Sequence, residues 1–311
     1  MLKVFVVKIS VFLCIPIALT ILVGAAFPPT PRSSTSLLFA KIEKDTLLKK
    51  SPSPRLILVG GSNLSFGINS QMIKDSLGLN PINTGIHASI GLKYMMDDVL
   101  DHIRAGDIVV IAPEYEQFYG KTAYGRNELL RIVFDIDRES LDSLDFQQWL
   151  KILPYFPRFS LSKLKPSEYF FQQSSNIGVY ERRAFNQYGD VYVHWNRQPK
   201  EVQPAGKGPK NFDESMIRII KEMTAFREKV LKKGAVLYIT FPGFQHSSFE
   251  NSKDNIFEIE RRLIKNDFVL LGSPERYKMP DNMMFDTPYH LNKEGVDLRT
   301  QRLIEDLKNA L

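Results

Sequence analysis

The segment RLILVGGSNLSFG, residues 55–67, decides the expected fold. Leu56–Val59 is a continuous apolar run, which is typical of a strand that is buried on both faces. Gly60 and Gly61 then allow a tight turn, and a helix is expected around Ser70–Leu77. A buried strand that passes through a glycine turn into a helix is a building unit of a parallel α/β sheet.

The same alternation of strand and helix patterns continues to the end of the chain. Apolar runs lie at residues 81–86, 107–112, 235–241 and 268–271, and helix-period segments lie at about 92–103, 214–232, 255–264 and 293–310. Five strands separated by helices predict a three-layer α/β sandwich around a mainly parallel sheet with right-handed connections.

Residues from about 121 to 211 interrupt this alternation. The segment is rich in aromatic residues and proline and holds both tryptophans, Trp149 and Trp195. Ligands of open α/β sheets bind beyond the carboxyl ends of the strands. An insertion that follows the third strand therefore either roofs such a site or is a structural elaboration only.

The 311 residues have a globular composition, with 43% hydrophobic and 24% charged residues. Residues 1–50 hold seven basic and two acidic residues and so carry +5 of the net charge of +6. The rest of the chain is almost neutral, and we expect no nucleic-acid binding, which needs a basic face. The single cysteine, Cys14, excludes an intrachain disulfide framework and a cysteine-rich zinc site; no cofactor or metal is expected.

Residues 9–27 form a stretch without a charged side chain. As a helix it would span about 28 Å, close to the roughly 30 Å of a bilayer core. Lys3 and Lys8 precede it, which favours a cytoplasmic N-terminus. We therefore predict a single transmembrane anchor at residues 1–27 in the inner membrane, with the rest of the chain on the periplasmic side. A cleaved signal peptide is the alternative, because Gly24-Ala25-Ala26 offers small residues near a cleavage point.

Residues 28–54 are expected to link the anchor to the domain. The part rich in proline and serine, up to Ser36, predicts an extended tether. Leu37–Lys50 predicts a short amphipathic helix that ends before the prolines at 52 and 54. The folded domain is then expected to span residues 55–311, with the insertion included.

Ser62 is the first candidate for chemistry. Glycines before a serine permit a tight turn that presents the hydroxyl at a helix N-terminus, where free N–H groups and the helix dipole favour developing negative charge. This setting suits a nucleophile beside an oxyanion hole. The same turn also suits a phosphate site or a plain connection between strand and helix.

A second candidate motif lies just before the last helix. Asp286 stands within one turn of His290. In such a pair the carboxylate orients the imidazole, and the imidazole removes a proton from a serine hydroxyl. His87, which follows the second strand, is a further histidine on the same side of the expected sheet; it either contacts substrate or is a satisfied loop histidine.

Together, the two ends of the domain resemble the SGNH/GDSL hydrolase superfamily. The similarity covers roughly residues 55–120 and 210–311, and it implies a flavodoxin-like α/β sandwich. The anchored layout resembles the bacterial cell-envelope branch, whose members include acyltransferases and esterases that act on polysaccharides.

The resemblance also implies roles for single residues. Ser62 would be the nucleophile, His290 the general base and Asp286 its orienting partner. Gly85, which follows Asn83 and Thr84 in the second block, would contribute its N–H to the oxyanion hole beside that of Ser62.

The sequence departs from the family pattern at three points. Gly60-Gly61-Ser62 replaces Gly-Asp-Ser, and Asp286 lies four residues before His290 instead of three. The asparagine of the third block, an oxyanion donor, has no counterpart where the third strand ends. An ionised Glu114 near an oxyanion would oppose it. Either Asn63, Tyr115 or Gln117 therefore replaces this donor, or the Glu114 side chain points elsewhere.

These features predict a serine esterase or O-acyltransferase that acts on an acylated carbohydrate of the cell envelope or of an exopolysaccharide. The expected partners are the membrane, an acylated glycan or acyl donor, and proteins of envelope polysaccharide assembly. The departures leave an alternative, a catalytically silent envelope protein that binds a glycan or an assembly partner in the same crevice.

Overall fold

The computed structural model describes residues 2–311. One parallel sheet holds five strands: β1 (Arg55–Gly60), β2 (Asn80–Asn83), β3 (Ile108–Ala112), β4 (Val236–Thr240) and β6 (Leu270–Leu271). Their order in the sheet is β2-β1-β3-β4-β6. This order is compatible with a flavodoxin-like sandwich and confirms the predicted parallel sheet.

Helices cover both faces of this sheet, because successive side chains of a buried strand point to opposite faces. Leu56 and Leu58 of β1 lie in one apolar layer with side chains from α4 and α13. Ile57 and Val59 lie in the other layer with side chains from α5, α10 and α12. The helices are α4 (Ser70–Leu77), α5 (Leu92–Leu100), α10 (Asp213–Lys232), α12 (Lys253–Lys265) and α13 (Lys293–Ala310). Each lies where a helix was predicted, and α4 and α13 have the predicted bounds.

Short elements complete the domain outside the insertion. They are α3 (Ser62–Ser65), η3 (Ala88–Ile90), α6 (Tyr115–Phe118), α11 (His246–Asn251), η10 (Asp281–Met283) and a separate pair of parallel strands, β5 (Phe244–Gln245) and β7 (Lys278–Met279). Several of them follow the carboxyl ends of β1, β2 and β3, so this edge of the sheet carries the loops of the candidate site.

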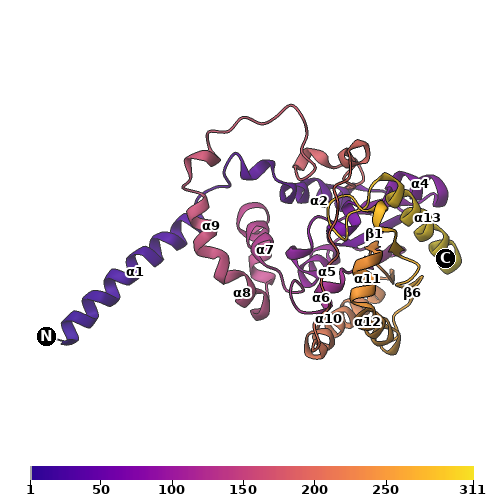
Figure 1. The fold of residues 1–311 in the computed structure, drawn as a ribbon. Helices are drawn as coiled ribbons and strands as arrows, with labels where there is room; N and C mark the ends of the chain where they lie inside the picture. Colours follow the sequence, from indigo (N-terminus) through magenta and orange to yellow (C-terminus); the bar gives the residue numbers. More distant parts are fainter. Residues whose placement is uncertain (1) are drawn as a thin grey trace.

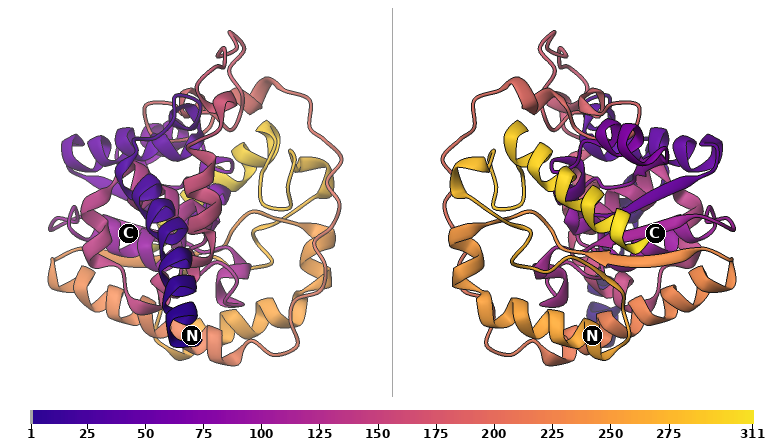
Figure 2. Two further views of the ribbon diagram at one scale, coloured as in Figure 1. Left: turned by 90° about the vertical axis from the view of Figure 1, so that its left-hand side faces the viewer. Right: turned by 90° about the vertical axis from the view of Figure 1, so that its right-hand side faces the viewer.

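The segment 121–211 folds into short helices without adding a strand to the central sheet. It holds α7 (Asn127–Arg131), the π-helix η4 (Ile132–Ile136), η5 (Arg138–Ser143), α8 (Phe146–Ile152), η6 (Leu153–Tyr155), α9 (Phe156–Ser162), η7 (Pro166–Glu168), η8 (Arg182–Ala184) and η9 (Val193–Asn196). Leu129, Leu130 and Val133 are buried in the same apolar cluster as β1 and β3, so this segment belongs to the domain core. After η9 the chain runs along the outside of the molecule to α10 (Figure 2).

The predicted N-terminal transmembrane helix is not found. Residues Leu2–Ala26 form helix α1, which projects from the domain (Figure 1). Among the described residues, however, no helix combines the length and the apolarity that a membrane crossing requires. The end of the predicted stretch is engaged by protein: α1 packs on α9, and the buried Lys163 donates hydrogen bonds to the carbonyls of Gly24 and Phe27 at 3.1 and 2.7 Å.

Residues 28–54 are packed against the domain. The expected extended tether contains the short turn η1 (Ser33–Thr35), and the expected helix is divided into η2 (Leu37–Ala40) and α2 (Lys41–Lys50). All four residues of η2 are buried. This linker therefore contributes to the core. Its content of proline and serine predicted a tether and did not show this packing.

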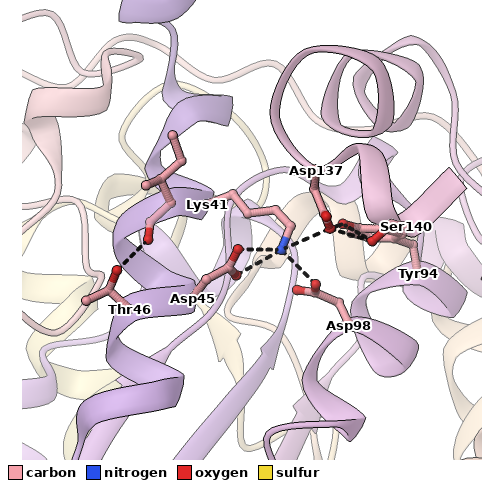
Figure 3. Close-up of polar contacts among 8 residues, drawn as sticks. Lys41, Asp45, Thr46, Tyr94, Asp98, Asp137 and Ser140 are labelled. Atoms are coloured by element: carbon pink, nitrogen blue, oxygen red, sulfur yellow. Dashed lines mark hydrogen bonds and ion pairs between the residues drawn. The ribbon is translucent and has the colours of Figure 1, made fainter.

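Ion pairs of Lys41 link α2 to two other parts of the chain (Figure 3). Its Nζ lies 2.8 Å from Asp45 Oδ1 on the same helix, 2.7 Å from Asp98 Oδ1 on α5 and 3.6 Å from Asp137 Oδ2 beside η4. The Tyr94 hydroxyl donates a hydrogen bond to Asp137 Oδ2 at 2.8 Å. One ammonium group thus joins the linker, the helical layer and the insertion.

A buried ion pair lies at the amino-terminal ends of β1 and β3. Arg55 and Asp107 are both fully buried, and the guanidinium binds both oxygens of the carboxylate. Arg55 also donates to the carbonyls of Leu48 and His102, each at 2.7 Å. Every polar group of this pair is therefore matched, as a charge in an apolar interior requires.

We expect Asp107→Asn to lower the free energy of unfolding by about 3–5 kcal/mol, because it leaves the Arg55 charge buried without a counter-ion. The matched control is Glu43→Gln, which removes the carboxylate of the exposed pair with Arg182 and should cost only about 0–1 kcal/mol. Urea denaturation of both variants measures the difference. Equal losses in the two variants would contradict the assigned role of the Arg55 pair.

Candidate functional site

The Ser62 turn forms where β1 meets β3. A Cβ on Gly60 would lie 2.7 Å from the Ala112 carbonyl oxygen, and one on Gly61 would lie 2.8 Å from Glu114 Oε1 and 2.9 Å from Ala88 Cα. Both positions therefore require glycine, because other segments of the chain approach so closely. Ser62 follows as the first residue of α3, as the sequence predicts, and is 9% exposed.

Glu114 is the nearest polar partner of Ser62. Its Oε1 accepts a hydrogen bond from Ser62 Oγ at 3.5 Å and one from the Asn63 backbone N–H at 3.2 Å. Burial raises the pKa of Glu114 to about 7, against the lowering effect of these bonds. A carboxyl group thus occupies the N-terminus of α3, where an anionic oxygen of a substrate would otherwise be stabilised.

Two of the three side chains predicted to replace the missing donor are engaged elsewhere. Asn63 Nδ2 donates to the Ala112 carbonyl at 3.1 Å. Gln117 forms a capping box with Glu114, and its Nε2 donates to the Ala88 carbonyl at 3.3 Å. The Tyr115 hydroxyl is buried without a hydrogen-bond partner within residues 2–311. Their roles as oxyanion donors stay predictions.

Gly85 is also engaged. Its N–H donates to Asn83 Oδ1 at 3.1 Å, and its carbonyl accepts from Ser65 Oγ at 3.0 Å. Asn83 Nδ2 donates to the Leu64 carbonyl at 3.0 Å and to the buried Asp190 at 2.8 Å. The second block is therefore bonded to the Ser62 turn and to the insertion, and the Gly85 N–H would have to leave Asn83 to bind a substrate oxygen.

Asp286 and His290 are paired. His290 Nδ1 lies 2.8 Å from Asp286 Oδ1, and the side chains are 6% and 8% exposed. Burial raises the pKa of Asp286, but the hydrogen bonds from His290 and Tyr180 outweigh it, so that the pKa is below its usual value. An ionised Asp286 holds the proton on Nδ1 and leaves Nε2 as the basic nitrogen.

The loop absorbs the four-residue spacing between Asp286 and His290. The Phe285 N–H donates to the His290 carbonyl at 2.8 Å, and the His290 N–H donates to the Thr287 carbonyl at 3.2 Å. These two bonds fold the segment back on itself. The extra residue therefore does not separate the carboxylate from the imidazole.

Phe66 brings the two motifs together. Its ring stacks on the His290 ring with a centroid distance of 4.1 Å and an interplanar angle of 9°. The Phe66 carbonyl accepts from the Leu291 N–H at 3.2 Å, and Phe66 follows Ser62 by one helical turn. The histidine loop therefore lies against the serine turn, although no hydrogen bond joins Ser62 Oγ to His290 in the described part of the chain.

Two residues of the site were missed by the sequence analysis. Tyr180, in the insertion, donates to Asp286 Oδ2 at 2.6 Å, and no sequence signal marks it. Arg299, in α13, is buried; it donates to the backbone carbonyl of Asn63, to Asn63 Oδ1 at 3.0 Å and to the Phe241 carbonyl at 3.3 Å. Arg299 stands at helical spacing between the buried Val296 and Leu303, a pattern that points it to the core.

The remaining titratable groups offer no metal site. Within residues 2–311, no group of three or more His, Cys, Asp or Glu side chains has a geometry that could hold a metal ion. His87 Nδ1 accepts a hydrogen bond from the Ser89 N–H at 3.2 Å, so this side chain caps the short helix η3 that follows it. His194 is buried and packs on Phe66 with a centroid distance of 5.0 Å; burial lowers its pKa to about 4, so it is neutral at pH 7.

Comparison of the chain with protein-family models, with curated proteins and with solved structures found no match.

We expect Glu114 to make the stability of the protein depend on pH. Because its pKa is raised from 4.5 to about 7, its neutral form stabilises the fold below about pH 4.5, and this contribution falls as the pH rises through 7. Relative to Glu114→Gln, the wild type should lose about 3 kcal/mol of unfolding free energy between about pH 4 and about pH 8. Urea denaturation of both proteins at the two pH values measures this. Parallel pH profiles would show that folding does not raise the pKa of Glu114.

Proposed function

We propose that this protein is an SGNH-like serine esterase or O-acyltransferase that acts on an acylated carbohydrate of the cell envelope or of an exopolysaccharide. The observation that carries the proposal is the buried Asp286–His290 pair, at 2.8 Å, on a loop that packs through Phe66 against the Ser62 turn. The sheet order, with Ser62 directly after β1 and His290 before the last helix, supports the same assignment.

In the proposed reaction Ser62 Oγ attacks the ester carbonyl carbon, and His290 Nε2 takes the hydroxyl proton. The tetrahedral intermediate then collapses, the C–O bond to the alcohol breaks, and His290 returns the proton to the leaving oxygen. Water or a sugar hydroxyl next attacks the acyl-enzyme and regenerates Ser62. Asp286 holds the imidazole and stabilises its positive charge. For this step Ser62 Oγ must turn away from Glu114 and form a hydrogen bond with His290 Nε2. Catalytic hydrogen bonds of this kind commonly tighten only when substrate binds.

Glu114 has a defined part in this mechanism. With a pKa of about 7, a large fraction of the side chain is protonated at neutral pH. A neutral carboxylic acid in an apolar setting donates a hydrogen bond to a developing oxyanion, as in ketosteroid isomerase. Glu114 would then supply the donor that the family obtains from asparagine, while its ionised form would oppose the reaction.

Ser62→Ala is expected to abolish both the turnover of a small acetyl ester and the labelling of the protein by a serine-directed phosphonate, because the nucleophile is removed. The matched control is Ser65→Ala in the same turn, since the Ser65 hydroxyl is bonded to the Gly85 carbonyl and takes no part in the proposed step. Mass spectrometry of the labelled protein and an ester assay give the two readouts. Unchanged activity or labelling in Ser62→Ala would contradict the mechanism.

A catalytically silent protein that binds a glycan or an assembly partner is the second candidate function. It is favoured by the contacts that occupy the site: Glu114 accepts from Ser62 and Asn63, and Gly85 donates to Asn83. Polysaccharide binding by a wild-type protein that shows neither phosphonate labelling nor ester turnover at high enzyme concentration would support this alternative.

The proposal includes a location at the periplasmic face of the inner membrane. Helix α1 carries exposed apolar side chains along its length, among them Phe12, Ile17 and Leu22. Such a surface is unfavourable in water and is covered at low cost by lipid. Exposure of this helix supports lipid contact at the membrane surface.

We expect the full chain to sediment with membranes and to stay there in high salt, since apolar contacts are not screened. A variant with Phe12→Glu and Leu22→Glu should move to the supernatant. Both side chains are exposed, so the domain should keep its thermal stability. Wild-type protein that is soluble after cell lysis, or a variant that sediments as the wild type does, would contradict lipid contact through α1.

A further inference from the structure

A polar cleft with a volume of about 530 Å³ lies between the insertion and the segment that follows α1. Its walls come from α7, α9, the residues on either side of α9, Ser89 of η3, and Thr30 and Ser33 of the linker. The volume is within the range of sites for small molecules. Ser62 and His290 do not line this cleft.

Basic side chains outnumber acidic ones in the lining of the cleft. They are Arg126, Arg131, Arg158, Lys163 and Lys165. Lys163 is neutralised, because its Nζ lies 2.7 Å from Asp135 Oδ1 and both side chains are only 2% exposed. Arg131, Arg158 and Lys165 form no ion pair and no side-chain hydrogen bond with any described residue. Within residues 2–311, three cationic groups of the cleft lining therefore have no carboxylate at ion-pair distance, and Asp135, the nearest acidic partner of Arg131, is bonded to Lys163.

The carboxylates of the cleft do not balance this charge. Glu128 and Glu168 are the acidic lining residues left after Asp135 is paired, and Glu168 accepts a hydrogen bond from Thr30 at 2.9 Å. Arg126 adds a fourth cation. Its Nε donates to the Tyr155 hydroxyl at 2.9 Å, which holds the guanidinium at the wall and leaves its other N–H groups for a ligand.

We propose that this cleft binds a phosphate group of a phosphorylated ligand. Arginine side chains present planar N–H donors that match phosphate oxygens in pairs, and a phosphate can accept from several cations that converge from different elements. Arg131 comes from α7, Arg158 from α9 and Lys165 from the turn after α9, so the three approach the cleft from different positions.

The place of the cleft indicates two sources for such a phosphate. Thr30 and Ser33 follow the exposed Phe27 at the end of α1, and Lys163 bonds this end to the wall of the cleft. A phosphate here is carried either by a lipid headgroup beside α1 or by a soluble phosphorylated compound. The inference is independent of the proposed Ser62 chemistry, and inactivity of the enzyme would leave it unchanged.

The test compares the full chain with the triple variant Arg131→Gln, Arg158→Gln, Lys165→Gln. One arm measures binding of inorganic pyrophosphate to the detergent-solubilised protein by calorimetry. The second arm measures co-sedimentation with vesicles of phosphatidylcholine alone and of phosphatidylcholine mixed with phosphatidic acid. The matched control, Lys229→Gln, Lys232→Gln, Lys233→Gln, removes three exposed lysines from the end of α10 and lowers the net charge equally.

We expect the triple variant to lose about tenfold or more in affinity for pyrophosphate, or in the extra binding that phosphatidic acid gives, while the control keeps both. Loss in the pyrophosphate arm assigns a soluble phosphate, and loss in the vesicle arm alone assigns a lipid headgroup. Absence of binding in both arms would overturn the proposal. Equal losses in the triple variant and the control would also overturn it, because binding would then follow net charge only.

Discussion

The buried guanidinium of Arg299 is the contact on which the candidate site depends. Arg299 lies in α13, the helix that directly follows the histidine loop. Its guanidinium donates hydrogen bonds to the backbone carbonyl and the side chain of Asn63, the residue next to Ser62. Burial lowers its pKa to about 10, so it stays charged at neutral pH. A charge at this depth is tolerated only where its donors are matched, which fixes the serine turn relative to the last helix. Arg299 thus joins the helix that follows the His290 loop to the residue next to Ser62.

Glu114 gives the site its distinctive electrostatics. In a serine hydrolase the helix N-terminus beside the nucleophile accepts the developing oxyanion. Here the Asn63 N–H donates to a carboxyl group from the end of β3, and the burial of this carboxyl raises its pKa to about 7. The same residue therefore either supplies a donor or blocks one, depending on its protonation. In the proposed mechanism only the neutral form of Glu114 assists the reaction.

The insertion links the site to the N-terminal part of the chain. Tyr180 bonds the carboxylate of the Asp286–His290 pair, and Asp190 bonds Asn83 of the second block. Other residues of the insertion hold the end of α1 and line the basic cleft. The insertion is thus a structural part of both regions. A ligand in the cleft would lie against η3, which directly follows His87 on the carboxyl-end side of the sheet.

The sheet, its helices and the paired motifs could be predicted from the sequence, because strand and helix periods, glycine turns and the Asp286–His290 spacing are local properties. The sequence could not determine which polar groups are already engaged. The sequence predicts Gly85 and Asn63 as oxyanion donors. In the structure the Gly85 N–H already donates to Asn83, and the N–H groups of Asn63 donate to Glu114 and Ala112. The sequence also predicted a transmembrane helix, which is not found among the described residues. Tyr180 and the cleft depend on contacts between distant segments, which only the tertiary structure decides.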